Sequence, residues 1–296
     1  MHTIILFYKY IHIENPEELR KSQLGLSLRF NLKGRVIVAE EGINATLEGT
    51  AENIDEYLKQ FLVDKRFAYT DIKKSVGTGN AFPKLKVKVR PEIVSLHLED
   101  DIDPNQITGK HLKPEELKKW YEDGREFYVI DMRNDYEFNV GRFKNSRLIP
   151  VQNFRDLPAM LRKAMQTGIP KVSSGIWDLQ DKTVLAVCTG GVRCEKASGL
   201  LIREGFKDVY QLDGGIVRYM EKFPAQEFQG SLYVFDNRIT MDFDSKEKHV
   251  VVGKCDKCAA SSERYVNCKN PKCNKHFICC EDCSEEEKPF CKECKK

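Results

Sequence analysis

The stretch Val187-Cys-Thr-Gly-Gly-Val-Arg-Cys194 contains the residues whose types and spacing point most directly to covalent chemistry. Cys188 follows an apolar run, and two glycines separate it from a helical pattern that begins near Cys194. A thiol at a helix N-terminus, inside a loop of backbone amides, is favoured as the thiolate. We therefore expect Cys188 and Arg193 to be catalytic, assisted by four loop amides, those of Thr189, Gly190, Gly191 and Val192.

The spacing between the Cys188 thiol and Arg193 distinguishes a phosphatase loop from a sulfur-carrying loop. A cysteine-dependent phosphatase has its arginine at the sixth position after the cysteine, whereas here Arg193 is at the fifth and Cys194 at the sixth. This smaller loop suits a persulfide sulfur better than a phosphate. Cys194 has two interpretations: it resolves an oxidised or persulfidated Cys188, or it is a small side chain packed in the first helical turn.

The end of the chain is rich in cysteine. None of the 11 cysteines precedes Cys188, and most of them form closely spaced pairs near the C-terminus. Such pairs predict tetrahedral zinc sites of structural type, with iron–sulfur ligation as the alternative and a metal-free reduced tail as the third interpretation. The candidate ligands are more than two four-ligand sites require, so the grouping stays open: Cys255, Cys258, Cys268, Cys273, His276, Cys279, Cys280, Cys283, Cys291 and Cys294.

Three regions follow from the periodicity of apolar residues. Residues 1–94 alternate strand-like and helical patterns in the order βαββαβ, with the last strand at 85–89, which predicts a ferredoxin-like or acylphosphatase-like α+β domain. Residues 95–113 read as a polar connector. Residues 114–224 have strands at 127–130, 183–187 and 209–212 separated by helical segments, which predicts an α/β domain with a parallel sheet. Residues 225–296 are expected to form a hairpin around 232–243 and the cysteine-rich tail.

The strand at residues 84–90 has four basic side chains on one face, because strand side chains alternate with a period of two. They are Lys84, Lys86, Lys88 and Arg90. The favoured interpretation is a solvated sheet face, and the alternative is a surface that contacts RNA phosphates. The net charge of +3 comes from residues 1–94, so a basic surface is sought there first.

Composition excludes several classes of protein. With 296 residues, 41% hydrophobic and 31% charged, the chain is neither disordered nor fibrous. No apolar run is long enough for a membrane span, and the N-terminus does not read as a secretory signal, so a cytoplasmic protein without a membrane partner is expected. No G-x-G-x-x-G sequence marks a flavin or nicotinamide site, and the six histidines form no recognisable iron triad.

Three segments make the middle of the chain similar to the rhodanese family of sulfurtransferases. Residues 129–137 resemble its entry strand and turn, residues 141–146 resemble its G-H-I-x-G-A segment with departures at Arg142, Phe143 and Ser146, and residues 212–216 match its late L-D-G-G-I sequence. The resemblance implies that Cys188 is the catalytic residue. We interpret Asp131 and Glu137 as structural, and Arg133 as a candidate to face the catalytic loop.

The resemblance becomes narrower when the segments 39–49, 188–196 and 230–238 and the cysteine-rich tail are taken together. In that order they resemble the rhodanese-containing tRNA uridine hydroxylases, which implies oxygen-dependent conversion of the wobble uridine to 5-hydroxyuridine. The partner implied is the anticodon loop of tRNA, not DNA, and molecular oxygen is the co-substrate. Glu40, Glu41 and Asn44 are candidates to line the RNA cleft, although turn chemistry explains them too.

Two other functions remain open from the residues. The loop alone is compatible with a sulfurtransferase that carries a persulfide on Cys188. A third hypothesis is a zinc-dependent RNA-binding scaffold, against which the intact Cys188 argues. The same fold serves several chemistries, so the fold cannot choose among them.

Overall fold

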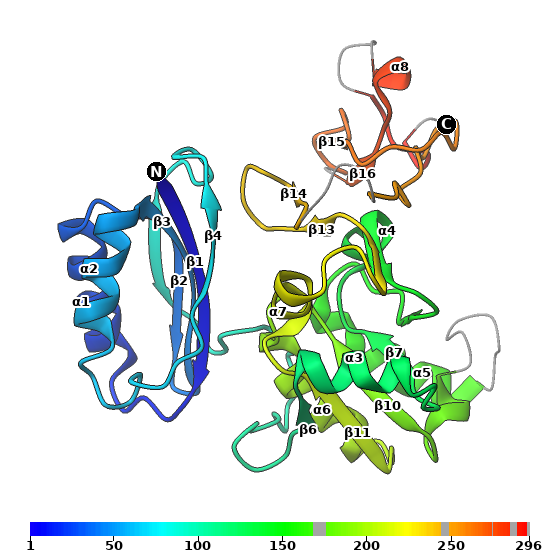
Figure 1. The fold of residues 1–296 in the computed structure, drawn as a ribbon, viewed down its shortest axis with the longest axis horizontal. Coiled ribbons are helices and arrows are strands. Elements are labelled where there is room, and N and C mark those ends of the chain that lie inside the picture. The colour runs from blue at the N-terminus through cyan, green and yellow to red at the C-terminus, as the bar shows by residue number, and fades with distance from the viewer. Residues whose placement is uncertain (168–175, 244–248, 274, 285–288, 295–296) are drawn as a thin grey trace.

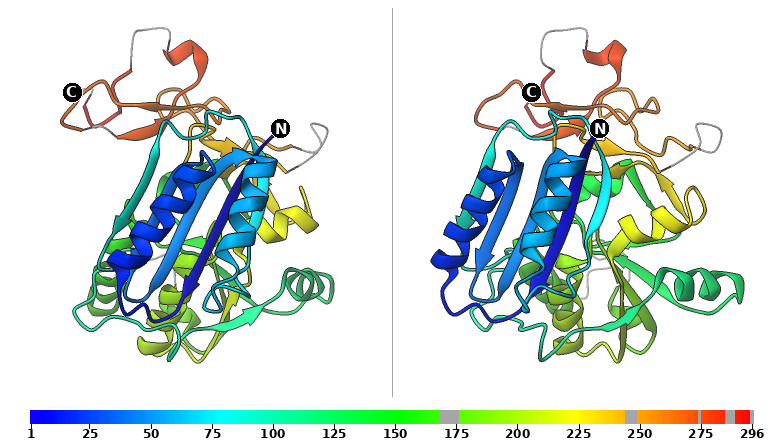
Figure 2. Two further views of the ribbon diagram at one scale, coloured as in Figure 1. Left: turned by 90° about the vertical axis from the view of Figure 1, so that its left-hand side faces the viewer. Right: turned by 60° about the vertical axis from the view of Figure 1, so that its left-hand side comes forward.

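The computed structural model describes residues 1–167, 176–243, 249–273, 275–284 and 289–294. Figure 1 shows three parts: an N-terminal sheet with two helices on its outer side, a larger α/β part, and a cysteine-rich tail that lies above the α/β part. The face of the N-terminal sheet without helices is turned toward the α/β part (Figure 2). The expected fold class, an α/β chain with an N-terminal α+β domain and a cysteine-rich tail, is confirmed.

The N-terminal sheet has the strand order β4-β1-β3-β2-β5. Apolar residues alternate along its central strands, and those facing the helices form one buried core. Asn15 caps the first helix through its side chain, and Thr50 caps the second. The elements are β1 (His2–Tyr10), α1 (Pro16–Arg29), β2 (Lys33–Ala39), β3 (Gly42–Thr50), α2 (Ala51–Phe61), β4 (Lys73–Gly77) and β5 (Leu85–Val89).

The prediction for the last strand of this domain was wrong. The strand that completes the βαββαβ unit is β4, which pairs antiparallel with β1, whereas β5 is an additional strand at the opposite edge, parallel to β2. The sequence of β4, Lys-Lys-Ser-Val-Gly, has one large apolar residue, Val76, and it is exposed. Such a strand has no alternating pattern to detect, and its pairing with β1 defines it.

The α/β part contains a parallel sheet of order β6-β11-β10-β7-β9 with buried apolar clusters on both faces. The predicted parallel α/β domain is thus confirmed. Its elements are β6 (Lys110–Leu112), α3 (Pro114–Glu122), β7 (Tyr128–Asp131), α4 (Asp135–Val140), β8 (Gly141–Phe143), β9 (Arg147–Leu148), α5 (Leu157–Thr167), β10 (Thr183–Val187), α6 (Val192–Arg203), β11 (Asp208–Leu212), α7 (Gly215–Lys222) and β12 (Phe228–Gly230), with 3-10 turns at Phe154–Asp156 and Trp177–Leu179.

One strand of this sheet lies in the segment expected to be a connector. β6 pairs in parallel with β11 at the sheet edge. A strand of three residues is too short to show a period of two, so the segment 95–113 looked structureless.

The C-terminal part begins with the predicted hairpin, β13 (Leu232–Tyr233) paired with β14 (Thr240–Met241). The tail follows with β15 (Tyr265–Asn267), β16 (His276–Ile278) and the short helix α8 (Glu281–Ser284). No helix in the described part of the chain has both the length and the apolar character needed to cross a bilayer.

Candidate active site and metal centres

The loop after β10 holds the Cys188 thiol at the N-terminus of α6. All side chains of β10 from Val184 onward are buried, and Cys188 is fully buried at its carboxyl end. The Gly191 N–H donates a hydrogen bond to Sγ of Cys188 at 3.2 Å. Gly191 has φ of 100°, a conformation that side chains other than glycine rarely adopt, so this glycine is required for the turn.

Helix α7 also orients this loop through backbone hydrogen bonds. The backbone N–H groups of Ile216 and Val217, at the start of α7, donate to the carbonyl oxygens of Cys188 and Thr189 at 2.9 and 3.0 Å. A Cβ on Gly215 would lie 2.7 Å from the Cys188 oxygen, so only glycine allows this approach. The carbonyls are thereby held by α7, and amides of the loop are free to face the sulfur.

The surroundings of Cys188 favour its thiolate. Burial by itself raises the pKa of the thiol, but the Cys194 side chain, the charge of Arg193 and the backbone N–H groups of Cys194 and Gly191 bring the pKa to about 6. The thiolate therefore predominates at neutral pH. The expectation that Thr189, Gly190 and Val192 also turn their amides toward the sulfur stays a prediction.

Cys194 lies in the first turn of α6, where its side chain interacts with Cys188 and is fully buried. Burial and the neighbouring Cys188 raise the pKa of Cys194 well above its usual value. Cys194 is thus a packed, protonated S–H donor to the Cys188 thiolate. Its role as a resolving thiol stays a prediction.

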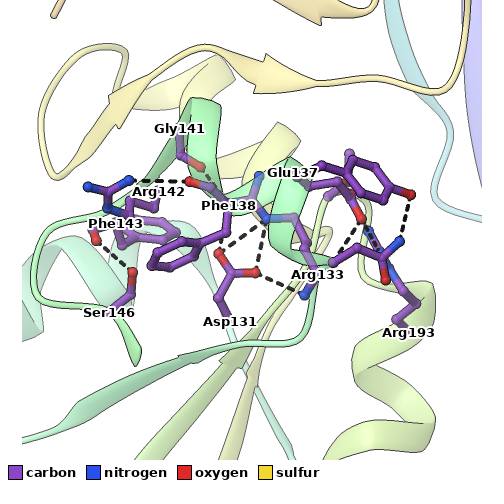
Figure 3. Close-up of polar contacts among 12 residues, drawn as sticks. Asp131, Arg133, Glu137, Phe138, Gly141, Arg142, Phe143, Ser146 and Arg193 are labelled. Carbon is purple, nitrogen blue, oxygen red and sulfur yellow. Dashed lines mark hydrogen bonds and ion pairs between the residues drawn. The ribbon is translucent and has the colours of Figure 1, made fainter. Parts of the chain in front are cut away.

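The Arg193 guanidinium is held by a carboxylate, and its catalytic role stays a prediction. Its Nη1 and Nη2 atoms donate to Oε2 and Oε1 of Glu137 at 2.6 and 2.7 Å, and Nη2 also contacts Oγ1 of Thr189 at 3.2 Å. Figure 3 shows this pair between α4 and the start of α6. Burial raises the pKa of Glu137, but the charge and hydrogen bonds of Arg193, the charge of Arg133 and the Asn134 N–H together hold the pKa below its usual range. Arg193 therefore acts on Cys188 through its charge.

Asp131 and Arg133 form a second buried pair next to the first (Figure 3). The Arg133 Nε and Nη2 atoms donate to the Asp131 carboxylate at 2.9 and 2.7 Å, and Nη2 also donates to the Gly141 oxygen at 2.6 Å. Arg133 thus ties β7 to β8, and the hypothesis that it faces the catalytic loop stays a prediction. The structural interpretation of Asp131 and Glu137 agrees with these contacts.

The segment that departs from the rhodanese pattern has local partners of its own. The Ser146 Oγ donates to the Phe143 oxygen at 2.7 Å, and the Phe143 ring is buried against Tyr219 and Phe228. Arg142 donates to the Phe138 oxygen at 3.4 Å (Figure 3). The departures therefore preserve a closed turn.

The N-terminal domain contacts the catalytic loop directly, and no local pattern in the sequence indicates this contact. A Cβ on Gly190 would lie 2.7 Å from Cδ2 of Leu6, and one on Gly191 would lie 2.8 Å from the Tyr8 hydroxyl. The Tyr8 hydroxyl donates to Oε1 of Glu195 at 3.0 Å. The loop glycines thus leave room for β1 as well as for the sulfur, and the N-terminal sheet covers the loop.

A buried lysine fastens the same interface. Lys196 is fully buried, and its Nζ lies 2.7 Å from Glu41, 2.9 Å from Glu92 and 2.6 Å from Asp101. Glu41 also accepts from the Ile93 N–H. Glu41 therefore has a structural role at this interface, and its place in an RNA cleft stays a prediction.

The other two residues proposed for that cleft differ from each other. The Asn44 amide donates to the Ile93 oxygen at 3.1 Å, so Asn44 also has a structural partner, and its place in the cleft stays a prediction. Glu40 is exposed in the turn between β2 and β3.

The basic strand β5 has all four candidate side chains exposed, Lys84, Lys86, Lys88 and Arg90. Its Lys86 pairs with Arg35 on β2, Arg35 pairs with Thr46 on β3, and Thr46 pairs with Leu6 on β1. Residues paired across a sheet lie on the same face. The exposed basic side chains therefore share the sheet face that meets the catalytic loop.

The tail cysteines form two groups of four. Cys255 and Cys258 join Cys280 and Cys283, while Cys268 and Cys273 join Cys291 and Cys294, with all ligand atoms of a group within 4.8 Å of one another. The Cys258–Cys280 and Cys273–Cys291 sulfur pairs are 3.6 and 3.7 Å apart. Four thiolates at about 2.3 Å from one zinc ion would be roughly 3.8 Å apart, so each group fits a single tetrahedral ion better than a cluster of irons and sulfides.

Two of the ten candidate ligands lie outside both groups, so their assignment as ligands is wrong. The His276 ring stacks on Tyr265 at 4.7 Å and contacts Oδ1 of Asn267 through Nδ1. Cys279 is buried, and although its thiol interacts with Cys255, it belongs to neither group of four. The two groups interleave along the chain, which pair spacing alone does not reveal.

Each of the three parts of the chain is matched by the model of a known protein family. Family models match residues 2–93 (UPF0176 acylphosphatase like domain), 113–222 (Rhodanese-like domain) and 229–295 (Rhodanase C-terminal). A tRNA uridine(34) hydroxylase of Bacillus licheniformis is 43% identical over 95% of this chain and 84% of its own length. One from Bacillus cereus is 44% identical over 95% and 85%. This chain belongs to the tRNA uridine(34) hydroxylase family.

Two solved structures align with part of the chain at low sequence identity. The rhodanese-like domain of an Anabaena protein covers 42% of the chain and 80% of its own, with 18% identity and a TM-score of 0.32. A yeast homologue of single-domain rhodanese covers 38% and 81%, with 20% identity and a TM-score of 0.31. The family resemblance read from the sequence is confirmed by the relatives, which span nearly all of the chain.

Proposed function

We propose that this chain hydroxylates the wobble uridine of tRNA at C5, with the Cys188 thiolate as the nucleophile. The observation that carries the proposal is the thiolate loop, in which the pKa of Cys188 is about 6, within a chain of the hydroxylase family. A thiolate present at neutral pH is a competent nucleophile without a separate general base. The base reaches the sulfur when the contact between β1 and the loop opens.

The chemistry follows from the electronics of uracil. The thiolate adds to C6, and the electron pair of the C5–C6 double bond moves toward O4, which makes C5 electron-rich. An oxygen atom from O2 then replaces the C5 hydrogen, while the second oxygen leaves as water with two protons and two electrons from a reductant. Departure of the thiolate restores the double bond. The Cys194 S–H and the Gly191 N–H stabilise that leaving thiolate.

Replacing Cys188 tests this function. Cys188→Ala and Cys188→Ser remove the nucleophile, so 5-hydroxyuridine and the nucleosides made from it should be lost from tRNA of cells that carry only the variant. Nucleoside mass spectrometry measures the loss. The matched control is Cys279→Ala, which removes a buried thiol outside the loop and should preserve the modification. Hydroxylation by the Cys188 variants would rule the mechanism out, and a selective loss of thiolated nucleosides would instead indicate sulfur transfer.

We also propose that the basic face of β5 binds the tRNA backbone near the anticodon. Lys84, Lys86, Lys88 and Arg90 are exposed on the sheet face that carries the loop contact. Three strand spacings separate β5 from β1, roughly 14 Å. Phosphates held at the strand would place the same RNA segment within reach of the loop.

Alanine at these four positions should weaken tRNA binding and change its salt dependence. Each lost phosphate contact lowers the slope of log K against log salt by about 0.7 to 0.9. We expect the quadruple variant to bind an unmodified tRNA transcript at least tenfold more weakly at low salt, with a slope reduced by about 3. The control is Lys21→Ala with Arg29→Ala on α1, on the outer side of the sheet. An unchanged slope in the quadruple variant would contradict the proposal.

The two cysteine groups are inferred to hold structural zinc, one ion each. All four positions of each group are protein thiols, so neither leaves a position open for catalysis. We propose a cytoplasmic location, where reduced thiols and tRNA coexist; all 11 cysteines are free of disulfides. In this proposal the N-terminal domain binds RNA, the α/β domain carries out the chemistry, and the cysteine-rich tail supports the α/β domain.

A further inference from the structure

Phe235 is an exposed aromatic residue in the turn between β13 and β14. Its side chain is 46% exposed, although burial of a phenylalanine ring is favourable. Its ring packs edge-to-face against Tyr233 at 5.4 Å, and Tyr233 packs in turn against Tyr136 and Tyr265. One side of the ring is thus supported by a partly buried cluster of edge-to-face aromatic rings, while the other remains in contact with solvent.

The turn that carries Phe235 is fastened to the N-terminal domain. Arg238 pairs with Asp236 at 2.7 Å, and its Nη1 donates to the Val76 oxygen at 3.0 Å. The Asn237 N–H donates to the Ala81 oxygen at 2.9 Å. The turn therefore connects the C-terminal hairpin to the N-terminal domain, and these contacts hold the ring against the N-terminal sheet.

The ring lies beside the catalytic loop. Phe235 lines a pocket together with Thr189 of the loop and with Leu6 and Thr46 of the N-terminal sheet. The Arg193 guanidinium carbon is 5.8 Å from the ring centroid. Thr46 belongs to the cross-strand row that continues to Arg35 and the basic strand. Phe235 thus lies near Leu6 and Thr46 at one end of this row, and the basic strand lies at the other end. The catalytic loop contacts the same sheet face at Leu6.

We propose that Phe235 stacks against an unstacked base of the RNA strand, next to the base presented to Cys188. The inference rests on the proposed function. Recognition of single-stranded RNA combines a basic surface for the phosphates with aromatic rings for splayed bases, and both are present here around one reactive thiolate. A ring held rigidly before binding loses little entropy on stacking.

Replacement of the ring should weaken binding of looped RNA and leave duplex RNA unaffected. The probes are an unmodified anticodon stem–loop transcript and a fully paired RNA duplex, titrated against the full chain by fluorescence anisotropy. Phe235→Ala should bind the stem–loop roughly 5- to 100-fold more weakly, and Phe235→Trp should restore the affinity to within about threefold. Duplex affinity should be unchanged, because a duplex offers no splayed base.

The matched control is Phe290→Ala, which removes a ring that is 40% exposed in the tail with Lys269 above it. Its affinity for both RNAs should equal that of the original chain at equal zinc content. Stem–loop binding by Phe235→Ala as tight as the original, an equal loss for duplex, or no rescue by tryptophan would each overturn the stacking role. Hydroxylation is scored separately, so an original chain that binds the stem–loop without hydroxylating it would refute the function and leave the stacking result readable.

Discussion

Replacing Glu137 by glutamine should destabilise the α/β part by about 3–5 kcal/mol, the usual cost of leaving one partner of a buried ion pair uncompensated. Glu137 is fully buried and Arg193 nearly so, with two hydrogen bonds between them. Glutamine keeps the shape and one acceptor but removes the charge, so the guanidinium is left charged in the interior. The loop that positions Cys188 depends on this pair, so hydroxylation should fall as well.

The effect should depend on pH in a defined direction. The pKa of Glu137 is below its ordinary value of 4.5 in the folded chain, so its ionised form contributes full stability above the unfolded pKa. That contribution is lost as the pH falls through the folded pKa. The stability difference between the original chain and Glu137→Gln should therefore be largest at neutral pH and shrink below about pH 4.

Urea unfolding followed by tryptophan fluorescence measures this difference, because both tryptophans, Trp120 and Trp177, lie in the α/β part. The control is Glu126→Gln, which breaks an exposed pair with Lys182 and should leave the urea midpoint unchanged. Equal midpoints for Glu137→Gln and the control would show that the buried pair is not needed for stability.

Removal of metal should unfold the cysteine-rich tail while the other two parts stay folded. The described core of the tail consists mainly of cysteines with Phe277, so little apolar surface is buried without an ion. Structural zinc contributes about 10–16 kcal/mol of binding free energy in small metal-dependent folds. We expect two zinc ions per chain by elemental analysis, and rapid proteolysis of the tail after treatment with a strong chelator.

Single substitutions distinguish the two groups from the residues outside them. Cys280→Ser and Cys291→Ser each remove a ligand from a different group and should each lower the zinc content by about one ion. His276→Ala and Cys279→Ala are the matched controls and should keep both ions. Loss of zinc in either control would contradict the grouping, and iron with sulfide in place of zinc would contradict the single-ion sites.

The sequence by itself determined the features that depend on neighbours along the chain. The order strand, Cys188, two glycines and helix dictates a thiol at a helix N-terminus, whatever the rest of the fold does. Apolar periodicity located β10 and the hairpin at 232–243 because their patterns are local. The resemblance to the hydroxylase family also rests on short, ordered segments, and the relatives confirm it.

The tertiary structure decided whatever depends on contacts between distant segments. β4 and β6 are strands because β1 and β11 pair with them, and their own residues carry no alternating pattern. The occupation of Arg193 by Glu137, 56 positions away, likewise reflects packing and charge compensation in the folded interior.

The same reason explains the metal groups and the cover over the active site. Spacing identifies cysteine pairs, but which pairs share an ion depends on how the tail folds back, and the structure interleaves them. Leu6 and Tyr8 reach the loop glycines from more than 180 positions away, through the docking of two domains. The local sequence determines that Cys188 lies at a helix N-terminus, whereas burial and long-range pairing decide which residues surround it. The free energies of burial and pairing arise only when distant segments come into contact in the folded chain.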